Sequence, residues 1–426
     1  MEKKQVLVTG MGVVSPIGRN IKDFEYSIKN GISGINKIED LKGPHCGNVI
    51  GADIKNFVFQ KDLKEFGLLP ENIISKASKC AGRSPFTIQT SVLAVMEAWE
   101  QAELYKGKVE PERIGIIVVG HNISQRYMYE MFTKYSGELE YMNPRYALHY
   151  MDTDNIGTIS EIFNIKGEGC TVGDASASGN AGIIKAYQLL QLDCVDICIV
   201  VAPPADLSSM EIQGFYNIGA MGGRRFVDSP EEACRPFDRN HEGFIYGQAA
   251  GCLILESAES VQKRAGKAMA EILGTSIVLD ANRLSDPSED GEVRAMTKAL
   301  DSANIEVADI NYINAHGSSS PLGDEVELKA LKRVFGESLK RIWINSTKGL
   351  TGHCLYSAAL IEAIAVIIQM RGSFVHPNIN LDDPIDTVVR FVKSKYENTD
   401  IEYAINNSFG FGGINTCVVF KKFTID

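Results

Sequence analysis

The chain has 426 residues, of which 44% are hydrophobic and 23% are charged, and its net charge is −11 at pH 7. This length is sufficient for a large buried core, built as one α/β unit or as two fused halves. The negative balance excludes a nucleic-acid binder, because no basic field is available to attract phosphates.

The nine cysteines form no CxxC pair, and several of them lie in apolar runs. We therefore expect free thiols in a reducing compartment, the cytoplasm, with no disulfide framework and no zinc site. The first residues lack the apolar core of a signal peptide, and no apolar run approaches about 18 residues, so we expect no membrane span.

Short β-branched runs alternate with helical patterns along the chain. Predicted strands cover residues 6–9, 114–119, 195–202, 249–256, 310–314, 341–345, 402–407 and 416–420. Predicted helices cover residues 91–103, 180–191, 292–303, 325–334 and 357–370. This alternation is typical of an α/β fold in which helices cover the sheets. A polar break at 257–266 divides the chain into residues 1–256 and 257–426, which we interpret as two halves of one core.

The segment "VTGMGVVSPIG" contains Gly10 and Gly12 and raises the possibility of a dinucleotide-binding turn. The third glycine of that motif is absent, since Ser15 stands in its place and Pro16 follows. We therefore interpret the segment as a tight turn after the first core strand.

The segment "GCTVGDASASGNAGIIKAYQLL", residues 169–190, passes from a β-branched run through small residues into a helical pattern. A strand-to-helix elbow of this kind presents a nucleophile at the positive end of a helix dipole. Ser176 occupies the centre of the elbow and is the candidate for that position.

Two further strands end in polar loops that contain histidines. His316 lies in "YINAHGSSSPLGDEVE", and Lys348 and His353 lie in "WINSTKGLTGHCLYSAA". Catalytic groups collect at the carboxyl ends of strands in α/β sheets. The glycine-rich turn in "NNSFGFGGINTCVVF" would let backbone N–H groups approach a substrate closely. Together these loops predict an active site.

The helix predicted at residues 357–370 is apolar on every face except at Glu362, Gln369 and several small residues. Such a helix is buried between layers, so we expect the carboxylate of Glu362 to have a partner.

In order, spacing and flanking residues, these segments resemble the β-ketoacyl-acyl carrier protein synthases of the elongating type, over nearly the whole chain. The resemblance implies the thiolase fold, in which two similar halves stack as five layers, α-β-α-β-α. It also implies a homodimer. The substrate would arrive on the phosphopantetheine arm of an acyl carrier protein, and no other cofactor is implied.

The family uses a Cys-His-His triad, and His316 and His353 match its two histidines. Lys348, Glu362 and Asp324 match residues that support the triad.

Further positions match the family around the substrate. Phe411 matches a gating phenylalanine whose backbone N–H pairs with that of the elbow residue as an oxyanion hole. Ser318 and Ser320 stand near the positions of threonines that contact the phosphopantetheine arm. For the carrier itself, Arg224 and Arg225 are candidate docking residues, and a structural salt bridge is an equally good explanation of them.

The chain departs from the family at the elbow, where Ser176 stands in place of the cysteine. Cys170 lies six residues earlier, on the entering strand, and cannot replace it. A smaller departure is Gln248, where the family usually has an acidic residue.

The serine separates the two tasks of a condensing enzyme. A thiol with a pKa of about 8.5 is readily activated, whereas a serine hydroxyl needs a paired base, so acyl loading and condensation are lost. Decarboxylation needs only hydrogen bonds to the developing enolate, which two imidazoles supply. The chain thus resembles the decarboxylating homologues of polyketide β-branching cassettes, which convert malonyl-carrier to acetyl-carrier. A 3-hydroxy-3-methylglutaryl synthase homologue then uses the acetyl group.

Three alternatives stay open at this point. The chain could be a non-catalytic partner of a true ketosynthase, similar to the chain-length factors. It could be a serine-based acyltransferase or thioesterase in which His316 activates Ser176, since Ser-His pairs recur on unrelated folds. It could also be a condensing enzyme that works with serine.

Overall fold

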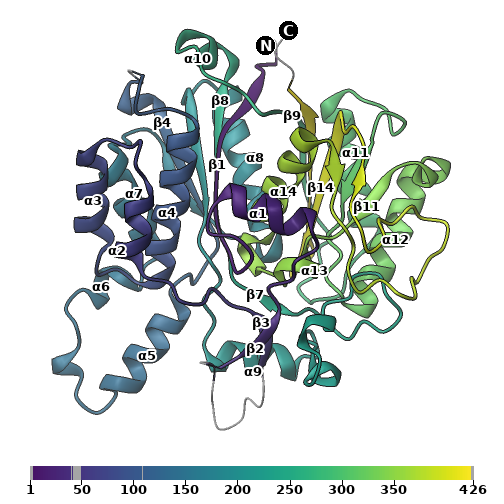
Figure 1. Cartoon of the computed structure of the whole chain (residues 1–426), viewed down its shortest axis with the longest axis horizontal. Coiled ribbons are helices and arrows are strands. Elements are labelled where there is room, and N and C mark those ends of the chain that lie inside the picture. Colours follow the sequence, from purple (N-terminus) through teal and green to yellow (C-terminus); the bar gives the residue numbers. More distant parts are fainter. Residues whose placement is uncertain (1–2, 40, 42–48, 108, 424–426) are drawn as a thin grey trace.

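A ten-stranded mixed sheet runs through the computed structural model of the protein (Figure 1). The structure describes residues 3–39, 41, 49–107 and 109–423. The strands of the first half are β1 (Val6–Val14), β4 (Ile114–Val119), β5 (Gly169–Val172), β6 (Ile197–Ala202) and β8 (Ala250–Ser257). Those of the second half are β9 (Ala270–Leu279), β10 (Tyr312–Asn314), β11 (Trp343–Asn345), β14 (Tyr403–Gly410) and β15 (Ile414–Lys422).

The two halves of this sheet have the same topology. The first half is ordered β5-β4-β6-β8-β1, and the second half is ordered β11-β10-β14-β15-β9. In each half the first three strands are parallel and the last two pairings are antiparallel. A short antiparallel pairing of β1 with β9 joins them. The predicted α/β fold of two similar halves is confirmed.

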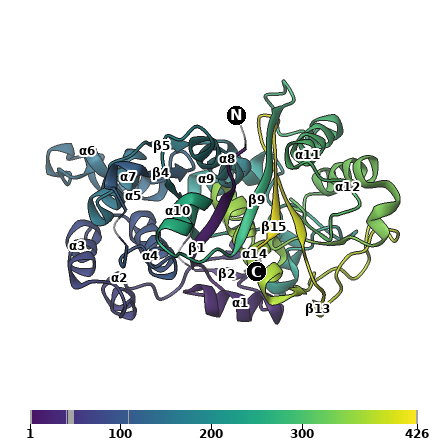
Figure 2. The same cartoon turned by 90° about the horizontal axis from the view of Figure 1, so that it is seen from above.

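Six helices complete the layers. They are α4 (Phe86–Gln101), α7 (Thr153–Phe163), α8 (Ser178–Gln191), α11 (Glu289–Ala303), α12 (Pro321–Phe335) and α14 (Ala358–Gly372). Helices α8 and α14 pack on each other between the half-sheets, whereas α4 with α7 and α11 with α12 cover the outer faces (Figure 2). The contact in the middle layer is close, because a Cβ atom on Gly179 would stand 2.3 Å from the backbone nitrogen of Leu360.

Shorter elements connect these layers. The helices among them are α1 (Ile21–Lys29), α2 (Phe59–Asp62), α3 (Glu71–Ala81), α5 (Gln125–Tyr135), α6 (Tyr146–His149), α9 (Ser209–Asn217), α10 (Ala258–Lys263) and α13 (Lys348–Thr351). Two small sheets contain β2 (Asn36–Ile38), β3 (Val49–Ala52) and β7 (Tyr246–Gly247), and β12 (Phe374–Val375) and β13 (Glu397–Asn398). Capping hydrogen bonds define where two of these helices begin. At α1, Asn20 accepts a hydrogen bond from the N–H of Asp23, and at α9, Ser208 and Glu211 form a capping box.

The tight turn predicted after the first core strand is present at residues 15–18, where the N–H of Ser15 donates to the carbonyl of Gly18 at 2.8 Å. Gly10 and Gly12 do not form it, because both lie inside strand β1. Helix α4 explains them. A Cβ atom would stand 2.3 Å from the carbonyl oxygen of Ala98 at Gly10, and 1.9 Å from that of Ala94 at Gly12. The glycines therefore let the helix backbone pack directly on the strand.

The polar break predicted at 257–266 coincides with helix α10, between the last strand of the first half and the first strand of the second. We propose that the two halves divide there, into residues 1–256 and 257–426. The cysteines of the described residues are free thiols, and Cys46 lies outside those residues.

One helical stretch, Leu355–Gly372, is long and apolar enough to cross a membrane by length and composition alone. However, 83% of it is buried inside the protein, as expected for the central helix α14 of a layered core.

Candidate active site

The elbow that contains Ser176 has the predicted strand-to-helix form. A single 3-10 turn, Ala175–Ala177, connects β5 to α8. Ala175 has a φ of 47°, in the left-handed region that non-glycine residues rarely adopt. The hydroxyl of Ser178 accepts from the N–H of Asp174 at 2.8 Å and donates to the carbonyl of Ala175 at 2.6 Å. These bonds hold Ser176 at the start of the helix.

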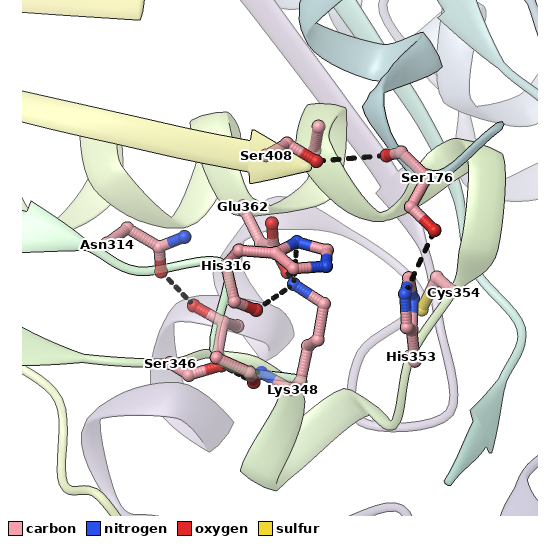
Figure 3. A network of polar contacts seen from close by, with 12 residues as sticks. Ser176, Asn314, His316, Ser346, Lys348, His353, Cys354, Glu362 and Ser408 are labelled. Atoms are coloured by element: carbon pink, nitrogen blue, oxygen red, sulfur yellow. Dashed lines mark hydrogen bonds and ion pairs between the residues drawn. The ribbon is translucent and has the colours of Figure 1, made fainter. Parts of the chain in front are cut away.

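The two predicted histidine loops converge on this elbow (Figure 3). Oγ of Ser176 lies 3.1 Å from Nε2 of His353. The ring of His316 lies beside that of His353, with ring centroids 5.6 Å apart and planes at 80°. Three segments that are far apart in the sequence therefore supply one constellation.

The hydrogen bonds of His353 fix its tautomer. Its Nδ1 accepts from the backbone N–H of Leu355 at 3.0 Å, so Nδ1 carries no proton. Burial, with a smaller effect of the Lys348 cation, holds the pKa of His353 well below its usual value. The imidazole is therefore neutral with its proton on Nε2, and this N–H donates to the Ser176 hydroxyl.

His316 is oriented in the same sense by Lys348. Nζ of Lys348 donates to the carbonyl of His316 at 2.6 Å and lies 3.5 Å from its Nδ1. Burial first, then Lys348 and His353, lower the pKa of His316 well below its usual value. With a cation facing Nδ1, the proton of this neutral ring is on Nε2.

The buried carboxylate of Glu362 has the partner that the sequence required. Its Oε1 lies 2.5 Å from Nζ of Lys348, and the two side chains are 2% and 0% exposed. Burial raises the pKa of Glu362, and the lysine opposes that rise. The pair anchors Lys348 in the core beneath His316 (Figure 3).

A residue that the sequence analysis did not single out, Glu327 on α12, holds the His316 loop. Its carboxylate accepts from the backbone N–H groups of His316 at 2.8 Å and Gly317 at 2.7 Å. Burial raises its pKa to about 7. The sequence feature that could have identified Glu327 is its position three residues after Asp324, because this spacing puts both acids on one face of a helix.

Asp324 lies beside the loop that follows His316. Its carboxylate accepts from the backbone N–H groups of Phe237 at 2.7 Å and Ser319 at 3.1 Å. The ring nitrogen Nδ1 of His241 lies 3.1 Å from the same carboxylate. Asp324 therefore links the loop at residues 318–320 to the segment that contains Phe237 and His241.

A cavity of about 730 Å³ opens over these residues. The predicted residues that line it are Ser176, His316, His353, Ser318, Ser320 and Phe411. Phe411 is 41% exposed, in the turn between β14 and β15, and lies at the mouth of the cavity. The remaining serine of the loop, Ser319, is buried, and its hydroxyl accepts from the N–H of Arg235 at 2.9 Å. Lys348 and Glu362 do not line the cavity and lie behind His316.

Two further sequence observations are explained by local contacts. Cys170 lies within β5, before the elbow, and packs against the core. Gln248 receives a hydrogen bond from the N–H of Ile54 at 3.0 Å and donates to Asp206 at 3.1 Å. An amide can donate to Asp206 where a second carboxylate would repel it.

Comparison with known proteins identifies the class. The sequence model of the beta-ketoacyl synthase N-terminal domain matches residues 3–260, and that of the C-terminal domain matches residues 269–382. The chain belongs to the β-ketoacyl synthase family, and its fold is the thiolase fold.

Individual relatives refine this picture. The chain is 39% identical over 418 residues to a polyketide biosynthesis malonyl-ACP decarboxylase, PksF, of Bacillus subtilis (strain 168), covering 98% of this chain and 96% of the relative. It is 34% identical over 427 residues to a 3-oxoacyl-[acyl-carrier-protein] synthase 2 of Staphylococcus aureus (strain COL), covering 99% of each.

Solved structures agree with this assignment. A type II polyketide synthase ketosynthase in complex with its acyl carrier protein matches with a TM-score of 0.84 and 26% identity, covering 99% of this chain and 100% of the other. A beta-ketoacyl synthase from Burkholderia phymatum STM815 matches with a TM-score of 0.85 and 25% identity over the same shares of the two chains.

Proposed function

We propose that this enzyme decarboxylates malonyl-acyl carrier protein to acetyl-acyl carrier protein and that it performs no condensation. The observation that carries the proposal is the pair of neutral imidazoles beside Ser176. In each ring Nδ1 faces its partner, which is Lys348 for His316 and the N–H of Leu355 for His353. The proton on Nε2 therefore points away from that partner. The relative named a malonyl-ACP decarboxylase supports the same reaction.

The reaction follows from these two donors. The bond between the carboxylate carbon and the α-carbon of the malonyl group breaks, and CO2 leaves. The bonding electrons pass to the thioester carbonyl, whose oxygen becomes an enolate oxygen. The Nε2–H groups of His316 and His353 hydrogen-bond to that oxygen, in a buried site where such bonds are strong. A proton from solvent then adds to the α-carbon and gives the acetyl thioester.

The serine-based acyltransferase is the second candidate. The histidine within hydrogen-bond distance of Ser176 is His353, at 3.1 Å, and not His316 as that hypothesis expected. A general base must accept the serine proton on the nitrogen that faces it. Nε2 of His353 already carries a proton, because Nδ1 accepts from Leu355. The Ser176 hydroxyl is therefore a hydrogen-bond acceptor from His353 and is not activated, which supports the decarboxylase and the loss of acyl loading.

A purely non-catalytic partner is less well supported. Such a protein has no need for two oriented imidazoles or for the buried Lys348–Glu362 pair, which costs free energy to bury. Both features are intact in this chain.

The carrier protein supplies the phosphopantetheine arm, and no further cofactor takes part in the proposed reaction. Ser318 and Ser320 line the cavity, which supports the proposal that they hydrogen-bond the arm. The exposed Arg224 lies over the ring of Tyr216, 4.8 Å from its centroid, whereas Arg225 donates to the carbonyl of Asn240 at 2.8 Å. We therefore assign carrier docking to Arg224 and a structural role to Arg225.

We propose a homodimer on the basis of two exposed features of the first half. Strand β5 is an edge strand of the sheet and exposes Gly169, so a second copy can pair with it. The segment from α5 to residue 151 also exposes a group of large apolar side chains: Tyr129, Phe132, Leu139, Tyr141, Leu148, Tyr150 and Met151. Large apolar side chains exposed together in one segment are typical of protein interfaces.

Within a pathway, the acetyl-carrier product would serve polyketide β-branching in the cytoplasm. An enzyme similar to 3-hydroxy-3-methylglutaryl synthase would add the acetyl group to a β-keto group on the growing chain.

Intact-mass spectrometry of a malonyl-loaded carrier protein incubated with the enzyme tests the proposal. We expect the carrier to lose the mass of CO2 and the enzyme to gain no adduct. An unchanged malonyl-carrier would favour the non-catalytic partner, and an acyl adduct on Ser176 would favour the acyltransferase.

A further inference from the structure

Two cavities lie on opposite sides of one wall close to Ser176. The active-site cavity has a volume of about 730 Å³, and the second cavity has a volume of about 460 Å³. Neighbouring residues face alternate cavities: Asp206 lines the second one and Leu207 lines the active site. Likewise, Ser124 lines the second cavity and Gln125 lines the first. The wall between the two cavities is therefore one layer of backbone with its side chains.

Tyr356 forms the active-site face of this wall. It lines the active-site cavity, is 5% exposed, and lies three residues after His353. Its hydroxyl donates to the carbonyl of Pro204 at 2.9 Å. The turn that contains Tyr356 packs against the turn that contains Ser176. The phenol ring therefore closes the cavity behind the reacting groups.

The ring packs closely against neighbouring backbone. Gly120 lies directly against it, because a Cβ atom there would stand 2.7 Å from a ring carbon of Tyr356. From the other side of the wall, the hydroxyl of Tyr246 donates to the carbonyl of Ala205 at 2.5 Å and accepts from the N–H of Leu207 at 3.3 Å. Hydrogen bonds of two buried phenols, Tyr246 and Tyr356, thus hold residues 204–207 in place between the cavities.

We propose that Tyr356 determines substrate size: it limits the acyl group at Ser176 to a short one, such as malonyl or acetyl, and excludes longer alkyl chains. This inference rests on the proposed function, since it concerns the group that the carrier delivers to the same site. A longer chain would have to displace the packed ring, which is unfavourable in a filled core. Removal of the ring would extend the active-site cavity toward the 204–207 segment.

A thiol introduced at the elbow by Ser176→Cys makes chain length measurable. The probes are carrier proteins whose pantetheine arm ends in a 2-bromopropanoyl or a 2-bromooctanoyl amide, so that both carry a secondary bromide and differ only in chain length. The thiolate displaces bromide at the α-carbon, so a C–S bond forms, bromide leaves, and the carrier becomes cross-linked to the enzyme. The arm occupies the mouth, so the alkyl chain must extend into the closed end.

Four enzymes are compared: Ser176→Cys alone, and Ser176→Cys combined with Tyr356→Phe, Tyr356→Leu or Tyr356→Ala. We expect the first two to cross-link the bromooctanoyl carrier at least about tenfold more slowly than the bromopropanoyl carrier. Tyr356→Leu should reduce this difference, and Tyr356→Ala should abolish it. Thermal unfolding confirms that each variant is folded, and the leucine variant covers the case in which the alanine variant is not.

Equal cross-linking of both probes by the enzyme that retains Tyr356 would overturn the inference. So would a folded alanine or leucine variant that still discriminates as strongly as the parent. Malonyl-carrier decarboxylation is measured separately on the chain with Ser176. A failure there would remove the proposed reaction without changing the chain-length readout, so the two failures are distinguishable.

Discussion

The backbone N–H of Leu355 donates to Nδ1 of His353 at 3.0 Å, and this bond decides what the imidazole can do. Because Nδ1 is the acceptor, the proton of the neutral ring is on Nε2, 3.1 Å from the Ser176 hydroxyl. His353 is therefore a hydrogen-bond donor to the site. A donor stabilises an enolate and does not activate a serine, so the local geometry separates decarboxylation from acyl transfer.

Removal of either imidazole tests the donors. We expect His316→Ala and His353→Ala each to lower the decarboxylation rate by about 10²–10³, the usual cost of one lost oxyanion donor. His353→Gln should retain more activity than His353→Ala, because the glutamine amide places an N–H near the position of Nε2. Single-turnover release of CO2 from malonyl-carrier measures the rates, and equal rates for the two substitutions would contradict the donor role.

The pH dependence of the rate tests the charge of these rings. The pKa values of His316 and His353 lie well below the ordinary 6.5, so both rings stay neutral as the pH falls to that value. We expect the histidines to add no change of rate between about pH 8 and pH 6.5. Glu327, which holds the His316 loop, has a pKa of about 7, so the profile is compared with that of Glu327→Gln. A loss of activity centred at the ordinary histidine pKa in both enzymes would show that one of the rings titrates normally.

The same shifts make a prediction for stability in acid. A histidine with a lowered pKa in the folded state takes up its proton first in the unfolded state, so stability falls as the pH falls below 6.5. Burial lowers the pKa of His376 to about 4, so its contribution is lost between 6.5 and about 4. Urea unfolding of His376→Gln and the parent should show a difference that shrinks on acidification through this range. A difference that is constant with pH would contradict the burial of a neutral ring.

The pH dependence of stability that we expect from Asp206 is opposite to that from the buried histidine. Burial raises its pKa from 3.8 to about 7, so its stabilising effect is present below 3.8 and is lost as the pH rises to about 7. Asp206→Asn keeps an oxygen that can accept from Gln248 and removes the titration. Relative to the parent, we expect this variant to gain stability between about pH 4 and pH 7, by about 1.4 kcal/mol for each unit of pKa difference. Denaturant midpoints at several pH values measure the gain, and a loss over this range would refute the assignment.

The Lys348–Glu362 pair predicts a strong coupling. Lys348→Met leaves Glu362 buried without its cation, and we expect a loss of about 3–5 kcal/mol in the free energy of unfolding. The double variant Lys348→Met/Glu362→Leu removes both charges and should recover most of that loss. Equilibrium unfolding of the single and double variants gives the coupling energy, and strictly additive effects would contradict a direct buried pair.

Much of the architecture was predictable because buried strands and apolar helices leave periodic patterns. The core strands β4, β6, β8 and β14 appear where β-branched runs predict them, and α14 appears where an all-apolar helix does. Strand β9 was missed, because alternate residues such as Gly274 and Ser276 interrupt its apolar pattern after a polar break. Its identity as a strand depends on pairing with β1 and β15, which are distant in sequence.

The residues of the site could be predicted from the sequence, but the hydrogen bonds between them could not. His316, His353 and Ser176 all follow strands or turns that share one edge, so their convergence follows from topology. The tautomer of His353 depends on the backbone of Leu355, which has a φ of 52° that no sequence pattern specifies. The support of the His316 loop by Glu327 depends in the same way on how α12 packs beneath the loop.

The most direct test of the central claim is the decarboxylation rate of Ser176→Ala. This variant removes the hydroxyl and keeps both imidazole donors, so we expect malonyl-carrier to become acetyl-carrier at a rate within about tenfold of the parent, a difference of about 1.4 kcal/mol in the barrier. A folded Ser176→Ala enzyme that releases no CO2 would contradict the account, because it would show that the serine itself takes part in the reaction.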